Sequence, residues 1–288
     1  MHILRVGTRM SDLARTQAAW AAEKIVAANE DLEGFELVGI TTKGDVDYSP
    51  LTEIGGTGLF TSAVRAALMS GECDLAVHSA KDLPAADPHE TRLFFPERAD
   101  ARDALCAHVP FAELPEGAKV GTGSPRRGAQ LRHLRPDIEI VPIRGNVPTR
   151  LARIDADLDA VILAQAGLDR LGITAGEPLD IDVMLPAPAQ GVLALETLPG
   201  TDAERWASAV NDPDTARAAR AERAFMVALK AGCTEPLAAY ATVDPLRLTV
   251  RYAGDGYLLE FAGEGTDPVE LGRRLAAQLA EARSERNS

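Results

Sequence analysis

The chain has 288 residues, 46% of them hydrophobic, and a formal net charge of -13 at pH 7. This length exceeds what one hydrophobic core supports, and the apolar fraction excludes a disordered chain, so we expect two or three domains. The acidic balance argues against a nucleic-acid-binding surface. The sequence contains no long, uninterrupted apolar run, so we expect no membrane-spanning helix.

The N-terminal sequence MHILRVGTRM leads directly into a strand pattern, without a charged leader followed by an apolar segment. This predicts a cytoplasmic protein. Cys73, Cys106 and Cys233 are widely separated and show neither the spacing of a disulfide framework nor that of a zinc site. Because the five histidines form no closely spaced pair either, we expect reduced thiols and no bound metal.

The first part of the chain alternates short β-like runs with helix-length amphipathic stretches. A strand at ILRVGT leads into a helix from Ser11 to Asn29, which Ser11 or Asp12 can cap. ELVGITT follows as a strand, a second helix covers Leu59 to Ser70, and CDLAVH has the pattern of a buried parallel strand. The polar segment from His78 to Asp82 then lies at the C-terminal end of that strand, where ligands bind in open α/β sheets.

A second series of the same units follows: KVGTGS, the helix after Pro125, IEIVPI, the helix after Asn146, DAVILA and a short helix. The Pro-containing segments Pro96 to Arg102 and Leu185 to Gly191 interrupt regular structure and indicate crossings between two α/β domains. Because Val192 to Glu196 is a strand-like run after the second crossing, we expect the chain to return to the first domain. Two crossings predict a hinged cleft.

From about residue 213 the pattern changes to a long helix, three strand-like runs and a last helix from about residue 268. Gly254-Asp255-Gly256, between two of the runs, is a hairpin signal. The fold class is therefore α/β, with two α/β domains that form a hinged cleft and a small C-terminal α+β domain. The expected boundaries are 1–97 with 192–208 for domain 1, 98–191 for domain 2, and 209–288 for domain 3.

Seven arginines lie between residues 122 and 153 against only two acids, in a chain that is acidic overall. Such a local excess predicts a pocket for a small polyanion. GTGSPRR has the pattern of a strand that runs into a helix whose first N–H groups face an anion, and IRGNVPTR repeats it about twenty residues later. The arginines best placed to bind carboxylates or phosphates through planar guanidinium groups are Arg126, Arg127, Arg144 and Arg150.

Several functional classes remain compatible with these residues alone. A hinged two-domain chain with an anion site suits an enzyme, a solute-binding module or the effector domain of a regulator. RNA binding by the arginine stretch is a further alternative, which the acidic total and the lack of aromatic residues among the arginines disfavour. Taken alone, Arg9 and Ser11 fit a helix cap beside a solvated arginine, and Lys81 with Asp82 fits a surface ion pair.

Eight motifs occur in one order along the chain: TRMSDLA, IGGTGLF, DLAVHSAKDLP, GTGSPRR, IRGNVPTRL, AGLDRLG, LPAPAQG and AGC. Together, over nearly the whole chain, they resemble the porphobilinogen deaminase (hydroxymethylbilane synthase) family of tetrapyrrole biosynthesis. The resemblance implies two cleft-forming α/β domains like those of periplasmic binding proteins, with a smaller third domain. Thr57 stands where many members have lysine, so we assign no charged role to it.

The resemblance also implies a transferase of porphyrin and heme biosynthesis with a dipyrromethane cofactor. The enzyme builds this cofactor from its own substrate and holds it through a thioether to a loop cysteine, here Cys233. Four porphobilinogen molecules are deaminated and joined head to tail onto the cofactor, and the linear tetrapyrrole is then hydrolysed off. The implied partners are porphobilinogen and linear pyrrole intermediates, with no nucleic acid, membrane or metal, and we expect a monomer.

By the same resemblance Asp82 is the catalytic carboxylate, which accepts pyrrole N–H groups and stabilises positive charge as ammonia leaves. The positions that match cofactor ligands are Cys233, Lys81, Asp82, Thr122, Ser124, Arg126, Arg127 and Arg150. The positions that match ligands of the incoming substrate or intermediate are Arg9, Ser11, Arg144, Arg150 and Arg170. Because each pyrrole bears an acetate and a propionate, a growing chain needs such cationic partners.

Overall fold

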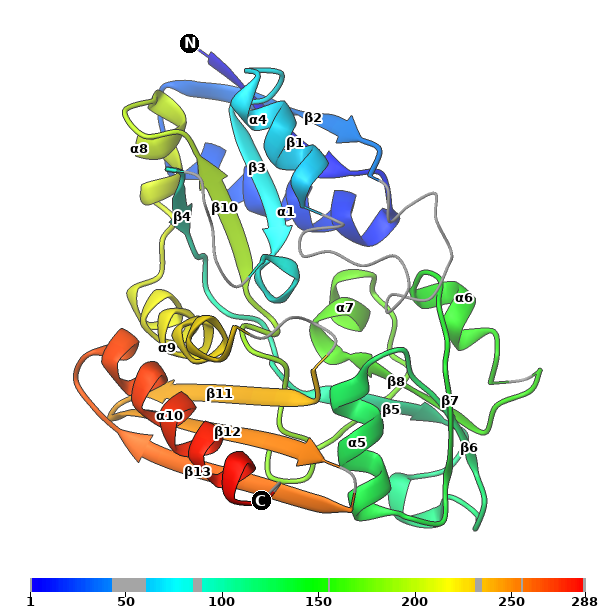
Figure 1. Ribbon diagram of the computed structural model, residues 1–288. Coiled ribbons are helices and arrows are strands. Elements are labelled where there is room, and N and C mark those ends of the chain that lie inside the picture. Colours follow the sequence, from blue (N-terminus) through cyan, green and yellow to red (C-terminus); the bar gives the residue numbers. More distant parts are fainter. Residues whose placement is uncertain are drawn as a thin grey trace. The chain divides into compact units, whose positions relative to one another are not determined.

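The computed structural model describes residues 2–42, 61–84, 90–154, 156–230, 235–254 and 256–286. The chain divides into two compact units (Figure 1). Unit 1 comprises Met1–Ala99 and Val192–Ala216, and unit 2 comprises Asp100–Gly191 and Arg217–Ser288. The chain therefore leaves unit 1 and returns to it within the two Pro-containing segments in which the sequence predicts crossings.

Unit 1 contains a five-stranded mixed sheet of order β2-β1-β3-β10-β4. Across the sheet these strands are β2 (Leu32–Ile40), β1 (His2–Arg9), β3 (Leu75–Ser79), β10 (Leu193–Thr197) and β4 (Arg92–Phe94). Strands β1, β2 and β3 are parallel, whereas β10, which follows the second crossing, is antiparallel to both of its neighbours. The helices are α1 (Asp12–Ala27), α4 (Ser62–Met69) and α8 (Asp202–Ser208).

The core of unit 1 forms where the apolar face of α1 meets the sheet. Ala18, Ala21, Ala22 and Ile25 of α1 are fully buried against Leu4 and other strand residues. These helix residues recur at the spacing of one helical face, so burial of this face fixes how α1 lies on the sheet. The amphipathic helix predicted for this stretch is thereby confirmed.

Unit 2 contains a second five-stranded mixed sheet, of order β7-β6-β8-β5-β9. Across the sheet these strands are β7 (Glu139–Val141), β6 (Lys119–Gly121), β8 (Ala160–Ala164), β5 (Asp103–Ala107) and β9 (Glu177–Pro178). Strands β6, β7 and β8 are parallel, and β5, which follows the first crossing, is antiparallel to β8. The helices of this part are α5 (Pro125–Leu134), α6 (Val147–Leu151), α7 (Gln165–Arg170) and the 3-10 turn η2 (Phe111–Glu113).

Unit 2 also contains a three-stranded antiparallel sheet, and helices cover one face of this sheet (Figure 1). Its strands are β11 (Leu237–Val243), β12 (Leu246–Gly254) and β13 (Tyr257–Glu264), and its helices are α9 (Pro213–Leu229) and α10 (Pro268–Arg286). Phe225 of α9 and Leu275 of α10 share a core with this sheet. A Cβ atom at Gly272 of α10 would lie 2.5 Å from the carbonyl oxygen of Ala221, so only glycine allows this close helix approach.

Arg251 of β12 joins the small sheet to the α/β part of unit 2. Its side chain is 8% exposed, and it donates to Glu260 Oε2 at 2.7 Å, to Gln130 Oε1 of α5 at 2.7 Å and to the carbonyl oxygen of Asp182 at 3.0 Å. Gln130 in turn bonds the backbone N–H and carbonyl of Leu185 at 3.0 Å each. A chain of buried hydrogen bonds therefore runs from β12 through α5 to the second crossing.

The α/β class and the small α+β part agree with the sequence prediction. The predicted helices and strands occur, with bounds that differ by a few residues, because helix ends depend on capping contacts that periodicity does not show. Within the part of the chain that the structure describes, no helix is both long and apolar enough to span a membrane.

Candidate functional site at the carboxyl edges of two sheets

In unit 1 the predicted site residues follow two neighbouring parallel strands. Arg9 is the last residue of β1, and Ser11 is the N-cap of α1. Lys81 and Asp82 lie in the 3-10 turn η1 (Ala80–Asp82), directly after β3. Strands β1 and β3 pair in parallel with Val6 opposite Leu75. Their carboxyl ends therefore meet at one edge of the sheet, which is where α/β sheets bind ligands.

The side chains at this edge differ in how they are engaged. The Ser11 hydroxyl accepts the backbone N–H of Ala14 at 3.4 Å, so it caps α1 as predicted. The Asp82 carboxylate is partly exposed and has no hydrogen-bond or ion-pair partner among the described residues. A carboxylate in this state is open to a ligand's donors.

In unit 2 the remaining predicted residues follow three parallel strands. Thr122 and Ser124 follow β6, Arg144 follows β7, and Arg170 ends α7, which begins directly after β8. Because β6, β7 and β8 are parallel, these carboxyl ends also meet at one edge. We call this set the cationic edge; its members are Thr122, Ser124, Arg126, Arg127, Arg144, Arg150 and Arg170.

Two capped helices begin at the cationic edge. The Ser124 hydroxyl accepts the backbone N–H of Arg127 at 3.4 Å, and the Asn146 side chain accepts that of Thr149 at 2.9 Å. Each helix has proline in its first turn, where the missing N–H costs nothing. The sequence repeat GTGSPRR and IRGNVPTR therefore corresponds to two helix starts that follow the neighbouring strands β6 and β7.

Arg126 and Arg127 are buried and bind one acid, Asp103, the first residue of β5. Arg126 Nη2 lies 2.7 Å from Asp103 Oδ2, and Arg127 contacts Asp103 Oδ1 through Nε at 2.9 Å and Nη2 at 2.7 Å. Gln190 Nε2 donates to the same Oδ1 at 2.9 Å. We call this group the Asp103 cluster; its members are Asp103, Arg126, Arg127 and Gln190.

The pKa values within this cluster show the competition between burial and charge. Burial raises the pKa of Asp103. The charges of Arg126 and Arg127 and the hydrogen bonds from Arg127 and Gln190 lower this pKa by more than burial raises it, so it falls to about 2. Burial lowers the pKa of Arg126, and the charge of Asp103 offsets this only in part. The cluster therefore holds an ionised carboxylate, and its two guanidinium groups are not fully compensated.

Arg144 and Arg170 lack carboxylate partners among the described residues. Arg144 Nη1 is buried without a hydrogen bond. Arg170 donates to the carbonyl oxygen of Gly191 at 2.9 Å, and burial lowers its pKa to about 10 despite the charge of Asp169. Arg150 Nε donates to the Gly145 carbonyl oxygen at 2.8 Å. Guanidinium groups in these states favour an anionic ligand.

Some predicted residues lie outside the described ranges. Cys233 falls between the end of α9 and the start of β11, and Thr57 precedes α4. The other two cysteines, Cys73 and Cys106, are buried free thiols, as predicted. Burial raises the pKa of each to about 11, so neither is ionised at neutral pH.

Neither Asp103 nor Gln190 is among the site residues that the sequence predicts. An acid at the start of the buried run DALCA was a usable signal, because a charge inside an apolar strand pattern requires a partner. Its partners lie 23 and 24 positions further along the chain and 87 positions away, at Gln190. Only the sheet topology brings them together.

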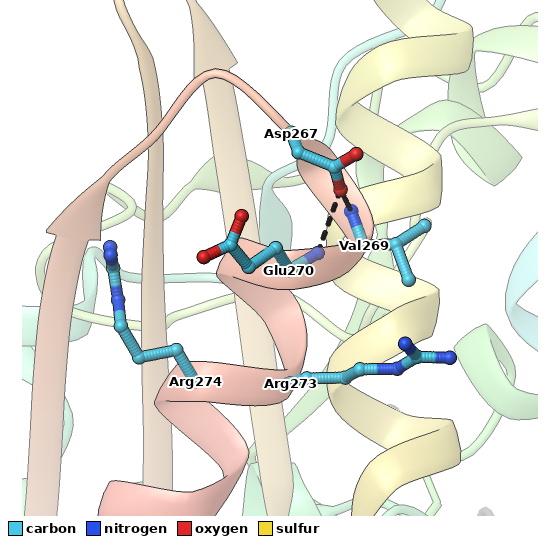
Figure 2. A pocket seen from close by; sticks show the side chains of 5 residues that line it. All are labelled: Asp267, Val269, Glu270, Arg273 and Arg274. Carbon is cyan, nitrogen blue, oxygen red and sulfur yellow. Dashed lines mark hydrogen bonds between the residues drawn. The ribbon is translucent and has the colours of Figure 1, made fainter.

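A surface pocket at the start of α10 contains none of the predicted site residues. Figure 2 shows its lining, which is Asp267, Val269, Glu270, Arg273 and Arg274. Asp267 accepts the backbone N–H groups of Val269 and Glu270 at 2.8 Å each, which is an ordinary helix cap. No group of acids, histidines or cysteines suited to a metal occurs within the described ranges.

Comparison with known families decides between the functional classes that the sequence leaves open. Residues 4–205 match the family model "Porphobilinogen deaminase, dipyromethane cofactor binding domain", and residues 216–281 match "Porphobilinogen deaminase, C-terminal domain". The chain belongs to the porphobilinogen deaminase family. It is therefore a transferase of tetrapyrrole biosynthesis that polymerises porphobilinogen, and its N-terminal segment contains the dipyrromethane-binding domain of that family.

Individual deaminases resemble the chain over nearly all of its length. The porphobilinogen deaminase of Corynebacterium glutamicum (strain R) is 46% identical, over 97% of this chain and 96% of that protein. That of Leifsonia xyli subsp. xyli is 49% identical, over 97% of this chain and 88% of that protein. Among solved structures, immunogenic lipoprotein A from Vibrio vulnificus is 16% identical, with a TM-score of 0.44, over 76% of this chain and 99% of that one.

Proposed function

We propose that this chain deaminates porphobilinogen, joins four molecules head to tail on its dipyrromethane cofactor, and releases hydroxymethylbilane by hydrolysis, with ammonia as the by-product. The observation that carries this proposal is the excess of guanidinium groups over carboxylates at the cationic edge. Arg144 and Arg170 lack acidic partners among the described residues, and Arg126 and Arg127 share one. Each pyrrole of the substrate carries two carboxylates, so the charges are complementary.

Asp82 is the proposed catalytic residue. Its carboxylate follows β3 at the carboxyl edge of unit 1, with no protein partner among the residues described. It can accept pyrrole N–H groups and stabilise the positive charge that develops as the aminomethyl nitrogen leaves as ammonia. A carboxylate so placed can also hold or release a proton at one of its oxygens.

The residues present fit a dipyrromethane. The cationic edge offers buried guanidinium N–H groups without acceptors, at Arg126 Nε and Arg144 Nη1, and a carboxylate ligand would satisfy such groups. The residues that would hold the cofactor are Lys81, Asp82, Thr122, Ser124, Arg126, Arg127 and Arg150, with Cys233 as the thioether ligand. When bound, the cofactor supplies the pyrrole carbon to which substrate is joined.

Arg9, Ser11, Arg144, Arg150 and Arg170 are the proposed ligands of the incoming substrate and of the linear intermediates. Arg9 and Ser11 lie at the carboxyl edge of unit 1, and the other three lie at that of unit 2. A planar guanidinium can bind both oxygens of one carboxylate, so these residues can orient the acetate and propionate as well as attract them.

Cys233 is the proposed attachment point because the other two thiols do not suit that role. Cys73 and Cys106 are buried, and burial holds the pKa of each thiol near 11, so little nucleophilic thiolate exists at neutral pH. Cys233 lies outside the described residues, between α9 and β11 along the chain. A thioether would form there if the thiol sulfur bonded to the aminomethyl carbon of a porphobilinogen unit while the amino group left as ammonia, with the thiol proton transferred to it.

We also propose a cytoplasmic monomer that needs no metal, nucleic acid or membrane, with three domains at 1–97 with 192–208, 98–191, and 209–288. The cysteine spacing supports a reducing compartment. The separate core of the three-stranded sheet and its own family match at residues 216–281 support a third domain.

The decisive experiment is the intact mass of the denatured protein beside Cys233→Ala and a matched control, Cys106→Ala. We expect an excess of two linked pyrrole units on the parent and on the control, and a bare polypeptide for Cys233→Ala. Incubation with porphobilinogen before denaturation distinguishes an apo preparation from a chain that cannot carry the group. An adduct that survives in Cys233→Ala would exclude this residue as the attachment point.

A further inference from the structure

Asp103 is the only acid bound to two of the proposed cofactor ligands within the described residues. It is fully buried, whereas Arg126 and Arg127 are 4% and 7% exposed. Arg127 uses all three of its nitrogens, two on Asp103 and Nη1 on the carbonyl oxygen of Ile162 at 3.0 Å. Arg126 binds Asp103 and the carbonyl oxygen of Leu185, and its Nε has no acceptor. Of these two arginines, only Arg126 therefore has a buried nitrogen that makes no hydrogen bond.

The charges in this group do not balance. Two permanently charged guanidinium groups face one carboxylate, and the pKa of that carboxylate is low enough that it is ionised at neutral pH. Arg251, whose charge also lowers the pKa of Arg126, is matched by Glu260 at 2.6 Å. The Asp103 cluster therefore carries one excess positive charge in a buried environment, where an unmatched charge is costly.

Without Asp103 the excess would be two charges. Arg126 and Arg127 are neighbours on the first turn of α5, and their like charges would repel each other at low dielectric. The Asp103 carboxylate offsets this repulsion, because Arg126 contacts one of its oxygens and Arg127 contacts the other. Gln190 fixes the acid, because its Nε2 bonds both Asp103 Oδ1 at 2.9 Å and the carbonyl oxygen of Ala101 at 2.8 Å.

We infer that Asp103 is a positioning residue: it is the internal counter-ion that holds Arg126 and Arg127 in place before the cofactor is attached, and it leaves one positive charge for a cofactor carboxylate to match. This inference rests on the proposed function. It assigns Asp103 a role in the apo chain that a cofactor carboxylate partly takes over in the loaded chain.

A double-mutant cycle tests this role. Asp103→Asn is made in the parent and in Cys233→Ala, and thermal midpoints are measured for all four chains after incubation with porphobilinogen, with intact mass as the record of loading. We expect Asp103→Asn to lower the midpoint by about 5–10 °C in Cys233→Ala. The loss should be about half as large in the loaded chain, because the anionic cofactor offsets part of the uncovered charge.

A buried acid with a purely structural role provides the control. Glu196→Gln alters a fully buried carboxylate of unit 1 that binds Arg65 and His78, and we expect equal midpoint losses in both backgrounds. Equal losses for Asp103→Asn as well, or a larger loss in the loaded chain, would overturn the inference. A folded Asp103→Asn chain that loads poorly or not at all would support the inference, because its two arginines are then no longer held in place for the cofactor.

If Asp103→Asn does not fold, Asp103→Asn with Arg127→Met restores a single excess positive charge to the cluster. We expect this double variant to fold, with one cooperative thermal transition. Its failure to fold would mean that the shape of Asp103, and not its charge, is required, and would contradict the inference. The failure of the proposed function is a separate result, because it appears as a parent chain that gains no mass from porphobilinogen.

Discussion

The two five-stranded sheets each bury one acid on the antiparallel fourth strand, and the two acids differ in the number of arginines that bind them. Glu196 of β10 binds Arg65 Nε at 2.7 Å, His78 Nε2 at 2.9 Å and the Thr91 hydroxyl at 2.7 Å. We call these four residues the Glu196 cluster, in which one arginine meets one carboxylate. In the Asp103 cluster two arginines meet one carboxylate.

The position of each acid along its strand accounts for the difference. Asp103 pairs with Ala164, the last residue of β8, so it lies at the carboxyl edge of the parallel strands. Glu196 pairs with Ala76, whereas the edge of that sheet is at the Leu193–Ser79 pair. Three residues of strand are about 10 Å. An acid inside the sheet is matched within the protein, whereas an acid at the edge can leave charge for a ligand.

The largest expected effect is a difference between two arginine substitutions. Arg65→Met leaves Glu196 buried without its cation and should cost about 3–5 kcal/mol of unfolding free energy. Arg127→Met leaves Arg126 and Asp103 as a balanced pair, so we expect a smaller loss, about 1.5–3 kcal/mol, from the missing hydrogen bonds. Denaturant unfolding of both variants measures this. An equal or larger loss for Arg127→Met would contradict the charge difference between the clusters.

Acid should weaken both clusters. Burial raises the pKa of Glu196, but the hydrogen bond and charge of His78, the hydrogen bond from Thr91 and the charge of Arg65 outweigh this and lower it from 4.5 to about 2. The pKa of Asp103 falls from 3.8 to about 2. A lowered folded-state pKa favours the ionised fold, so this stability is complete above about pH 4.5 and is lost as the pH falls toward 2.

The measurement is the denaturant midpoint as a function of pH for the parent, Glu196→Gln and Asp103→Asn. Each substitution should lower the midpoint at neutral pH and remove part of the fall below about pH 4.5. An unchanged acid slope in Glu196→Gln would mean that Glu196 does not contribute to it. The comparison of the two variants assigns the acid sensitivity to one sheet or the other.

A smaller effect is expected from a change of shape at constant charge. Arg144→Lys keeps the positive charge of the cationic edge but loses the planar fork, so kcat/KM for porphobilinogen should fall by about 10-fold. The matched control is Arg135→Lys, because Arg135 binds Asp137 at 2.6 Å, away from the predicted site residues. We expect it to leave turnover unchanged. Normal turnover in Arg144→Lys would remove Arg144 from the substrate ligands.

The sequence predicts the candidate ligand-binding residues better than it predicts the buried residues that hold them in place. Asp82 is predictable because a polar segment directly follows a buried strand, and Ser124 because serine before Pro-Arg-Arg is a cap pattern. Both are local signals. The Asp103 cluster depends on strand order, which places β5 beside β8, and no local pattern specifies that neighbour. The burial of Arg126 and Arg127 was unexpected for the same reason.

The hydrogen bond from Arg251 of β12 to Gln130 of α5 limits which substitutions the chain can accept during evolution. Arg251, Gln130 and Leu185 are joined by buried hydrogen bonds, and Gln130 lies one turn after Arg126 and Arg127 on α5. A lone substitution at Arg251 would leave the Gln130 oxygen and the Asp182 carbonyl short of a donor. The segments that match the two family models are therefore expected to be inherited as a pair, and exchange of one between relatives should succeed only when these contacts are exchanged with it.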